Sequence, residues 1–520
     1  MRAESRGLRL LQLVGVLLTV PLDAFALVPG HVKGAGSARQ HLHPAGGLNG
    51  RHSAAKQASS WETAVARGAP ATSLRAGDAA ISGGGAGGQM RKTQTDDEAD
   101  KSSMSESVFN LVKNVMGAGM LSLPSGVAAF SDARSAIAPA AAIIAALGAL
   151  SAYTFVLIGR SCSETKADSY EQSWARTVGE KSAWLPAGGC VATCFAGCLA
   201  YTIIIGDSFS ALAKTFGAPA IVANRSNIIM ALSALVLLPL SLLKNLKSLG
   251  FTSMLGTSGL FYTAVMMGIR CFDGSYAAGG RFHGILPEAG APVFGVTGAN
   301  PIRFLVLISM LSTAYEAHFN APLFYRELKN NTAPRYTKMV SASFLASVVT
   351  MTAVTAFGFL TFGGASSGYI LNNYANSDRL AALARIFVAT SILFSYPLCF
   401  VGLRDGIREM RGITPDQTKG RTAWTVGLIA LTSAVSLKLA DLGFVNSFCG
   451  ALIGSGIIYV FPALMFLRPL RKRMIAGGTK LTAAVRREVA VNNGIVVTGV
   501  LMGVLGAAVS VLETFTDLLG

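Results

Sequence analysis

The chain has 520 residues, of which 51% are hydrophobic and only 14% are charged, and its mean hydropathy is +0.49. Soluble globular domains carry about 25% charged residues, so this composition excludes an ordinary soluble domain and predicts an integral, multi-pass protein of the lipid bilayer. The formal net charge of +17 falls mostly on loops between apolar segments, which indicates a membrane orientation and argues against nucleic-acid binding.

The first hundred residues differ from the rest of the chain. Three arginines within the first ten residues precede an apolar run at 10–22, and Ala24-Phe25-Ala26 follows it, which is typical of a signal peptide over residues 1–26. Residues 27–102 are basic, rich in Ala, Gly and Ser and without periodicity, so they are predicted to be disordered.

This order of segments is similar to the two-part leader of plastid proteins in algae with complex plastids. The alternative is a disordered cytosolic tail that carries an apolar stub. The target membrane therefore stays open between the plasma membrane, an endomembrane or vacuole, and a plastid envelope.

Residues 103–515 form the predicted membrane domain. Eleven apolar segments follow residue 106, each close to the roughly 20 residues that cross a bilayer. They are 108–130, 137–158, 185–212, 227–243, 251–269, 304–324, 339–362, 380–401, 422–440, 444–467 and 494–512. The predicted fold is all-α and polytopic, with eleven transmembrane helices. Basic residues gather on the loops after the even-numbered segments, which places the start of the domain on the cytosolic side.

The first segment contains Asn114-Val-Met-Gly-Ala-Gly-Met-Leu-Ser-Leu-Pro124, which predicts an interrupted helix. In lipid, backbone groups freed by a break must face protein, water or a ligand. Paired broken helices near the bilayer midplane form the substrate sites of many secondary transporters. The candidate substrate-binding residues here are Met116, Gly117, Ala118 and Gly119. The alternative is a face of small residues that only packs against another helix.

The sixth segment contains an unusually polar window, Ser312-Thr-Ala-Tyr-Glu-Ala-His318. Thr313, Tyr315 and Glu316 are further candidate substrate-binding residues. A carboxylate at the midplane is costly, so the side chain of Glu316 is expected to face the protein interior. Its role stays open between partner of a substrate ammonium, proton carrier, and structural anchor bonded to Tyr315 or His318.

The third segment carries Cys190, Cys194 and Cys198 on one helical face. No His or carboxylate joins them in sequence, so close helix packing is favoured over metal binding. The chain contains no nucleotide loop and no nucleophile motif, and we expect neither an enzyme nor a resident cofactor.

The order of these motifs resembles the amino acid/auxin permease family. The resemblance rests on 107–124, 169–171, 200–207, 238–249, 314–328, 358–363 and 396–397, and it covers roughly residues 103–470. It is closest to the branch of sodium-coupled neutral amino acid transporters. It implies a LeuT-like fold, in which ten helices form two inverted five-helix repeats and one helix is added, with the first and sixth helices broken. It also implies a neutral amino acid as substrate.

The same resemblance implies a sodium site. It would take one oxygen from Asn114 and others from hydroxyls of the eighth helix, where Ser391 and Ser395 lie one turn apart. The alternative is that these hydroxyls bond only to their own helix. Three departures bear on both the substrate preference and the coupling ion. Ala317-His318 stands where sodium-coupled members carry Cys-His, Pro322 is one place out of their register, and Glu316 is not part of their pattern. The ion is therefore Na⁺ or H⁺, with sodium favoured slightly.

Two functions follow from the sequence. The first is a secondary active symporter that moves amino acids by alternating access. The second is an amino-acid-sensing membrane protein or an uncoupled facilitator. The sequence does not indicate a protein partner, the oligomeric state, the direction of transport or which amino acid binds.

Overall fold

The computed structural model describes residues 101–243, 250–286, 290–295, 302–413, 420–477 and 482–515. The predicted leader at 1–26 and nearly all of the segment at 27–102 lie outside the described residues. Within the described ranges the regular structure is helical, and the two β-bridges are isolated pairs, Ser102 with Leu328 and Val293 with Gly363. The all-α prediction is therefore confirmed for this part of the chain.

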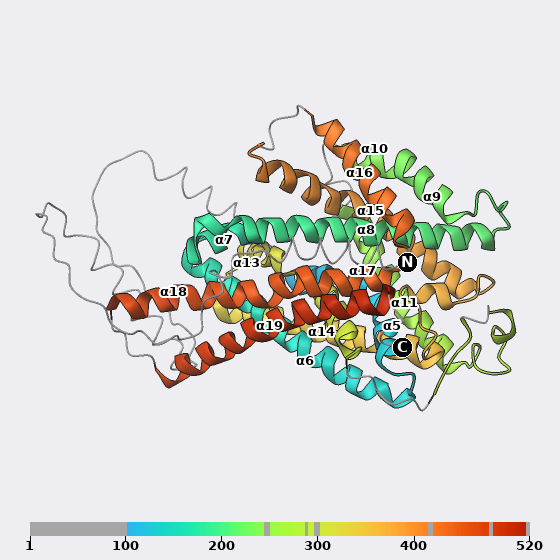
Figure 1. Cartoon of the computed structure of the whole chain (residues 1–520), viewed down its shortest axis with the longest axis horizontal. Helices are drawn as coiled ribbons and strands as arrows, with labels where there is room; N and C mark the ends of the chain where they lie inside the picture. The colour runs from blue at the N-terminus through green and yellow to red at the C-terminus, as the bar shows by residue number, and fades with distance from the viewer. Residues whose placement is uncertain are drawn as a thin grey trace, which may run out of the picture.

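The helices run roughly along one axis and form an elongated bundle (Figure 1). The first half contains α4 (Met104–Val115), η2 (Ala118–Ser122), α5 (Leu123–Phe130), α6 (Ile137–Thr165), α7 (Tyr170–Thr177), α8 (Trp184–Thr215), α9 (Arg225–Leu232), η5 (Ser233–Leu237), α10 (Leu238–Leu242) and α11 (Gly250–Phe272). The second half contains α12 (Phe304–Ala314), η9 (His318–Asn320), α13 (Ala321–Glu327), α14 (Ala333–Phe362), η10 (Ile370–Asn373), α15 (Arg379–Met410), α16 (Arg421–Lys438), α17 (Leu442–Cys449), η11 (Gly450–Gly454), η12 (Gly456–Val460), α18 (Phe461–Gly477) and α19 (Ala483–Phe515).

Each predicted apolar segment coincides with helical structure. Among the described residues, seven helical stretches are long and apolar enough to cross a membrane. These stretches contain α6, α8, α9–α10, α14, α15, α17–α18 and α19. The other four predicted segments fall on α4–α5, α11, α12–α13 and α16, and the first and third of these are interrupted.

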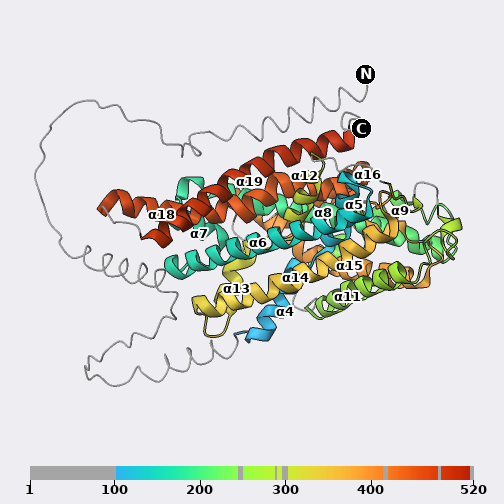
Figure 2. The ribbon, with the colours of Figure 1, turned by 90° about the horizontal axis from the view of Figure 1, so that it is seen from below.

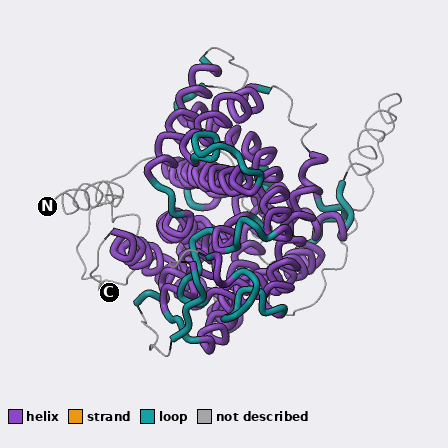
Figure 3. Tube along the Cα trace, turned by 90° about the vertical axis from the view of Figure 1, so that its right-hand side faces the viewer, coloured by secondary structure: helices purple, strands orange, loops and turns teal. Residues whose placement is uncertain are grey.

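Long helices in the bundle pack in pairs. α8 packs along α15, α6 along α14, and α11 against α15, while α12 contacts α5, α17 and α19. In the view along the bundle, some helices lie at its centre and others surround them (Figure 3). Small residues allow the close approach of α8 and α15: a Cβ on Gly197 would lie 2.9 Å from the sulfur of Cys399, and one on Gly402 would lie 2.9 Å from the sulfur of Cys194. The packing role predicted for Cys194 is confirmed.

The first predicted interruption is present between α4 and η2. The N–H of Gly117 donates to the carbonyl of Val115 at 2.9 Å, so the α-helical pattern of bonds to the fourth residue back ends at Met116. Gly117 has an extended backbone, with φ −88° and ψ 177°. Helical structure resumes in η2 and continues through α5, where Pro124 stands in the first turn. Proline is suited to that position because no N–H is needed there.

A second interruption separates α12 from α13. Tyr315 and Ala317 leave the helical region of backbone conformation, and η9 and α13 restart the helix three residues later. Pro322 stands in the first turn of α13. Both breaks therefore follow the same pattern, in which a half-helix ends, a short non-helical stretch follows and a proline-containing helix begins.

The ends of the bundle differ in character. The loop before α7, the start of α14, the end of α18 and the start of α19 lie at one end (Figures 1 and 2), and they carry many of the chain's Lys and Arg residues. We call this the basic end. The opposite end, which holds η10 and the start of α9, is called the distal end.

Candidate substrate and cation site

One large cavity lies between the two helix breaks. It has a volume of about 960 Å³, and α4, α8, α12, α15 and α17 contribute most of its walls. Drug-sized ligand pockets usually measure about 300–1,000 Å³, so this cavity has room for an amino acid. The predicted site residues that line it are Asn114, Met116, Gly117, Gly119, Thr313, Glu316, Ser391 and Ser395. The structure does not describe the side chain of Ala118.

The structure does not bring Tyr315 into the cavity. Its side chain is fully buried, and its hydroxyl donates to the carbonyl of Ile144 on α6 at 3.0 Å. Tyr315 lies two positions from Thr313, which is about 200° around a helix, whereas Glu316 lies three positions from Thr313 and returns to its face. Thr313 and Glu316 therefore face the cavity while Tyr315 faces α6. Its predicted role as a side-chain ligand is withdrawn.

Glu316 has a different partner from the two expected. One carboxylate oxygen accepts a hydrogen bond from the Thr193 hydroxyl on α8 at 2.6 Å. His318 instead contacts the Thr154 hydroxyl and the Ser151 carbonyl through Nε2, each at 3.0 Å, on a helix away from the cavity. In the described part of the chain, no ion pair joins Glu316 to a basic residue.

Sequence reasoning missed Thr193 as a site residue. Cys190 and Cys194, on the same face of α8, also line the cavity, whereas Cys198 is fully buried. The small residues of α8 predicted a face that packs against another helix. The contact of Thr193 with Glu316 shows that part of this α8 face is exposed to the cavity. The one available signal was the hydroxyl between the two cysteines.

A polar network joins the two breaks. The Ser122 hydroxyl donates to the Gly119 carbonyl at 2.8 Å, and the Asn446 amide donates to the Ser122 hydroxyl at 2.9 Å. The Thr313 hydroxyl then donates to the Asn446 carbonyl at 2.6 Å. Through these bonds α17 holds the first and sixth predicted segments in a fixed relation. Asn446 and Ser122 are also residues that the sequence did not single out.

The candidate cation ligands lie on walls of the same cavity. Asn114 is in the last turn of α4, where its side-chain oxygen accepts from the Asn320 amide at 3.5 Å. Ser391 and Ser395 lie on α15, and the Ser391 hydroxyl is so close to Gly256 of α11 that a Cβ there would overlap it. Neutral amide and hydroxyl oxygens are hard donors that suit a monovalent hard cation. Within the described residues, His, Cys, Asp and Glu side chains form no cluster that would hold a metal ion.

Comparison with known proteins decides the class. The family model described as "Transmembrane amino acid transporter protein" matches residues 100–512. The chain belongs to this family. It is a multi-pass membrane transporter rather than an enzyme, and it belongs to a family of amino acid transporters.

Individual relatives and one structure agree with this membership. The chain is 26% identical over 375 residues to the mouse (Mus musculus) "Putative sodium-coupled neutral amino acid transporter 11", covering 71% of this chain and 78% of the relative. It is 24% identical over 377 residues to "Vacuolar amino acid transporter 2" of Saccharomyces cerevisiae, covering 70% and 75%. The solved structure of Mhp1, a nucleobase-cation-symport-1 family transporter, matches with TM-score 0.50 and 12% identity, covering 80% of this chain and 92% of that one. The LeuT-like fold is thereby confirmed.

The cavity of this transporter opens toward the basic end. Its lining there includes Glu171 of α7 and Glu409 and Met410 of α15, all of which are exposed. Toward the distal end the lining stops near Ile204 and Leu442. The described structure therefore gives access to the two breaks from the basic end.

Beyond Ile204, three charged and polar side chains bond to one another at the distal end. Asp207 of α8 accepts from Arg225 at 2.5 Å and from Asn372 at 2.9 Å, and Arg225 also donates to the Ser436 carbonyl at 3.1 Å. We call Asp207, Arg225 and Asn372 the distal cluster. It connects α8, α9, η10 and α16 at the end where the cavity stops.

Asp207→Ala is expected to open the distal end. A hydrogen bond to a charged group contributes about 1.5–3 kcal/mol, and 1.4 kcal/mol corresponds to a factor of about ten. A cysteine placed at Ile204 should therefore be labelled at least about tenfold faster by a membrane-impermeant thiol reagent applied from the distal side. Unchanged labelling in Asp207→Ala, with Lys214→Ala as the control variant, would show that the distal cluster does not hold this end closed.

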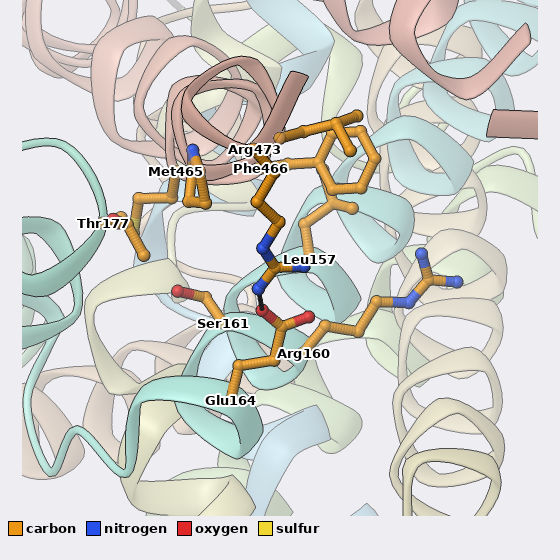
Figure 4. Close-up of a pocket in the computed structure, with 10 residues that line it drawn as sticks. Leu157, Arg160, Ser161, Glu164, Thr177, Met465, Phe466 and Arg473 are labelled. Atoms are coloured by element: carbon orange, nitrogen blue, oxygen red, sulfur yellow. Dashed lines mark hydrogen bonds and ion pairs between the residues drawn. The ribbon is translucent and has the colours of Figure 1, made fainter. Parts of the chain in front are cut away.

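A second and much smaller cavity lies at the basic end between α6, α7 and α18 (Figure 4). Its volume of about 30 Å³ is close to the space of a single water molecule, which excludes it as a substrate site. Figure 4 shows the ion pair between Arg473 of α18 and Glu164 of α6, at 3.2 Å. Arg160 of α6 pairs with Glu488 of α19 at 2.6 Å. These pairs attach the α18–α19 hairpin to the bundle.

Proposed function

We propose that this protein is a secondary active transporter that moves amino acids by cation-coupled symport with alternating access. In this proposal the membrane domain has eleven transmembrane helices, of which the first ten form two inverted five-helix repeats. The observation that carries the proposal is the position of both helix breaks on one cavity of about 960 Å³. Family membership and the LeuT-like fold support it.

The substrate backbone fits between the two breaks. The amino end of a helical stretch carries partial positive charge and free N–H groups, which suits a carboxylate. Such an end begins at Gly117–Gly119, and glycine there allows close approach of a ligand. The carboxyl end of α12 at Thr313 and Ala314 carries partial negative charge and suits the substrate ammonium. These contacts are the same for every amino acid, whatever its side chain.

The coupling ion is proposed to be sodium, held by Asn114, Ser391 and Ser395. All three line the cavity, and the mouse relative is named as sodium-coupled. That relative's name also specifies neutral amino acids, which is the substrate class that the resemblance implies for this chain. A proton carried by Glu316 is the competing assignment, because its carboxyl group lines the cavity without a basic partner among the described residues.

Purified protein in proteoliposomes tests the proposed function. A panel of radiolabelled amino acids should exchange across the membrane when the vesicles are preloaded with unlabelled substrate. Protein-free vesicles are the control. If the vesicles exchange no amino acid although the protein binds one, the protein is a sensor and the transporter proposal is overturned.

The leader is expected to determine location and to be dispensable for transport. A reporter fused behind residues 1–100 should reach an internal membrane compartment, and a variant that begins near residue 101 should keep exchange activity in proteoliposomes. A reporter that stays in the cytosol would show that the leader is only a tail. Asn224-Arg-Ser226 is an exposed sequon, and its glycosylation in cells would indicate the secretory route over a plastid envelope.

A further inference from the structure

The charge balance of the cavity leaves one negative group without a partner. The Glu316 carboxylate lines the cavity, where it accepts a hydrogen bond from the Thr193 hydroxyl, and no basic residue pairs with it in the described part of the chain. Removing a charge from water without pairing it is costly. A cation brought by the transport cycle would remove that cost.

The zwitterionic part of an amino acid does not supply this cation. Under the proposed function, on which this inference rests, the substrate carboxylate meets the break at Gly117 and the ammonium meets the carboxyl end of α12. Those two helix ends already balance the two backbone charges. The proposed sodium ligands lie on α4 and α15, and Asn114 bonds to Asn320 rather than to Glu316. One further positive charge is therefore needed beside Glu316.

The route to Glu316 is also acidic. Glu171 and Glu409 stand at the opening of the cavity, although that opening lies at the basic end of the bundle. Partial burial, and then the neighbouring Glu409, raise the pKa of the Glu171 carboxyl above its usual value. Among the described residues that line the cavity, the acidic ones are Glu171, Glu316 and Glu409, and Lys113 is the one basic residue. A cleft with mostly negative side chains concentrates cations at its entrance.

The cavity beside Glu316 has room for a long side chain. Between Glu316 and the opening, the α8 wall of the cavity includes the small residues Ala187 and Cys190. The cavity of about 960 Å³ continues from Glu316 to the opening, which is more space than a small neutral side chain needs. The thiols of Cys190 and Cys194 carry no charge that would compete with Glu316 for the substrate.

We propose that Glu316 determines specificity by binding the positively charged side chain of a basic amino acid, so that the substrate class is lysine-like and arginine-like amino acids. Thr193 is a positioning residue that orients the carboxylate through its 2.6 Å hydrogen bond. This substrate class differs from the neutral one that the family resemblance implies. The proposed class rests on Glu316, which is not part of the pattern of sodium-coupled members.

Exchange assays with Glu316→Gln test the inference. Proteoliposomes preloaded with unlabelled substrate are given radiolabelled lysine or arginine, and alanine or glutamine in parallel. The wild type should prefer the basic pair. Glu316→Gln should lower the ratio of lysine to alanine exchange by about 30-fold or more, since it removes one partner of the proposed charge pair. Glu316→Asp should restore part of the lysine exchange because it keeps the charge.

Two further variants separate specificity from folding. Thr193→Val should weaken the apparent affinity for lysine and leave the maximal rate of alanine exchange unchanged. Glu409→Gln, a matched loss of one acid at the cavity opening, should slow lysine entry at low salt without changing the ratio of lysine to alanine at high salt. A Glu316→Gln protein that exchanges alanine normally is folded.

The results that overturn the inference are distinct. If the wild type exchanges only neutral amino acids, or if Glu316→Gln lowers lysine and alanine exchange equally, Glu316 does not bind a basic side chain. Either result leaves the proposed function standing. If the wild type exchanges no amino acid of either class, the proposed function fails and this inference fails with it.

Discussion

Gly117→Leu is expected to abolish amino acid exchange while leaving the protein folded and inserted in the membrane. A Cβ at Gly117 would meet no other atom within 4 Å, so a leucine there enters the cavity instead of pushing neighbouring helices apart. It would occupy the space in which the substrate carboxylate approaches the first break. Exchange should fall below about 1% of wild type, measured with radiolabelled substrate and normalised to protein in the vesicles, because about 3 kcal/mol of lost binding corresponds to more than a hundredfold.

Neighbouring glycines provide matched controls. At Gly119 a Cβ would contact Ala314 and Thr313 at 3.8 Å, so Gly119→Leu should also block the site. At Gly126 a Cβ would lie 2.9 Å from the sulfur of Met310, and Gly126→Leu should instead lower thermal stability. Gly117→Ala should keep partial activity. Normal exchange by Gly117→Leu would remove the first break from the substrate site.

Asn114→Ala is expected to raise the sodium concentration needed for half-maximal uptake by about tenfold or more. The substitution removes one of three side-chain oxygens proposed for the ion, and losing one such interaction costs about 1–3 kcal/mol. Ser395→Ala should act in the same direction. The measurement is initial uptake rate against sodium concentration at fixed pH, with substrate at saturation.

Glu316→Gln separates sodium coupling from proton coupling. It keeps the size of the side chain and removes the group that can carry a proton. If sodium is the coupling ion, the dependence of alanine uptake on sodium should be unchanged in this variant. If Asn114→Ala has no effect, and Glu316→Gln loses pH-driven accumulation but keeps exchange, the sodium assignment is wrong. If neither variant changes coupling, the protein is a facilitator or a sensor.

Features set by local chemistry were predictable from the sequence. The two breaks follow from glycine, from proline and from polar residues inside apolar segments, and the structure places them at Met116–Gly117 and Tyr315–Ala317. Apolar segments of about bilayer length located the helices for the same reason. The membrane fold needs little tertiary information, because each span satisfies most of its own backbone hydrogen bonds.

Features that depend on packing between helices were not predictable. The sequence of α8 shows no sign that Thr193 meets Glu316, since that contact requires the second break to lie against one face of α8. The Tyr315 hydroxyl bonds to the Ile144 carbonyl, a partner that only the packing of α6 against the second break supplies. Asp207 and Arg225 are 18 residues apart, and only the fold brings Asn372 to the same carboxylate. Asn446 joins the two breaks from a helix more than a hundred residues away from either.

Gradient-driven uptake tests the central claim of cation-coupled transport most directly. Proteoliposomes with a sodium gradient directed inward should accumulate radiolabelled substrate above the outside concentration, then release it when a sodium ionophore collapses the gradient. The same vesicles with equal sodium on both sides should reach only the outside concentration. Uptake that stops at the outside concentration under both a sodium gradient and a pH gradient would contradict the account.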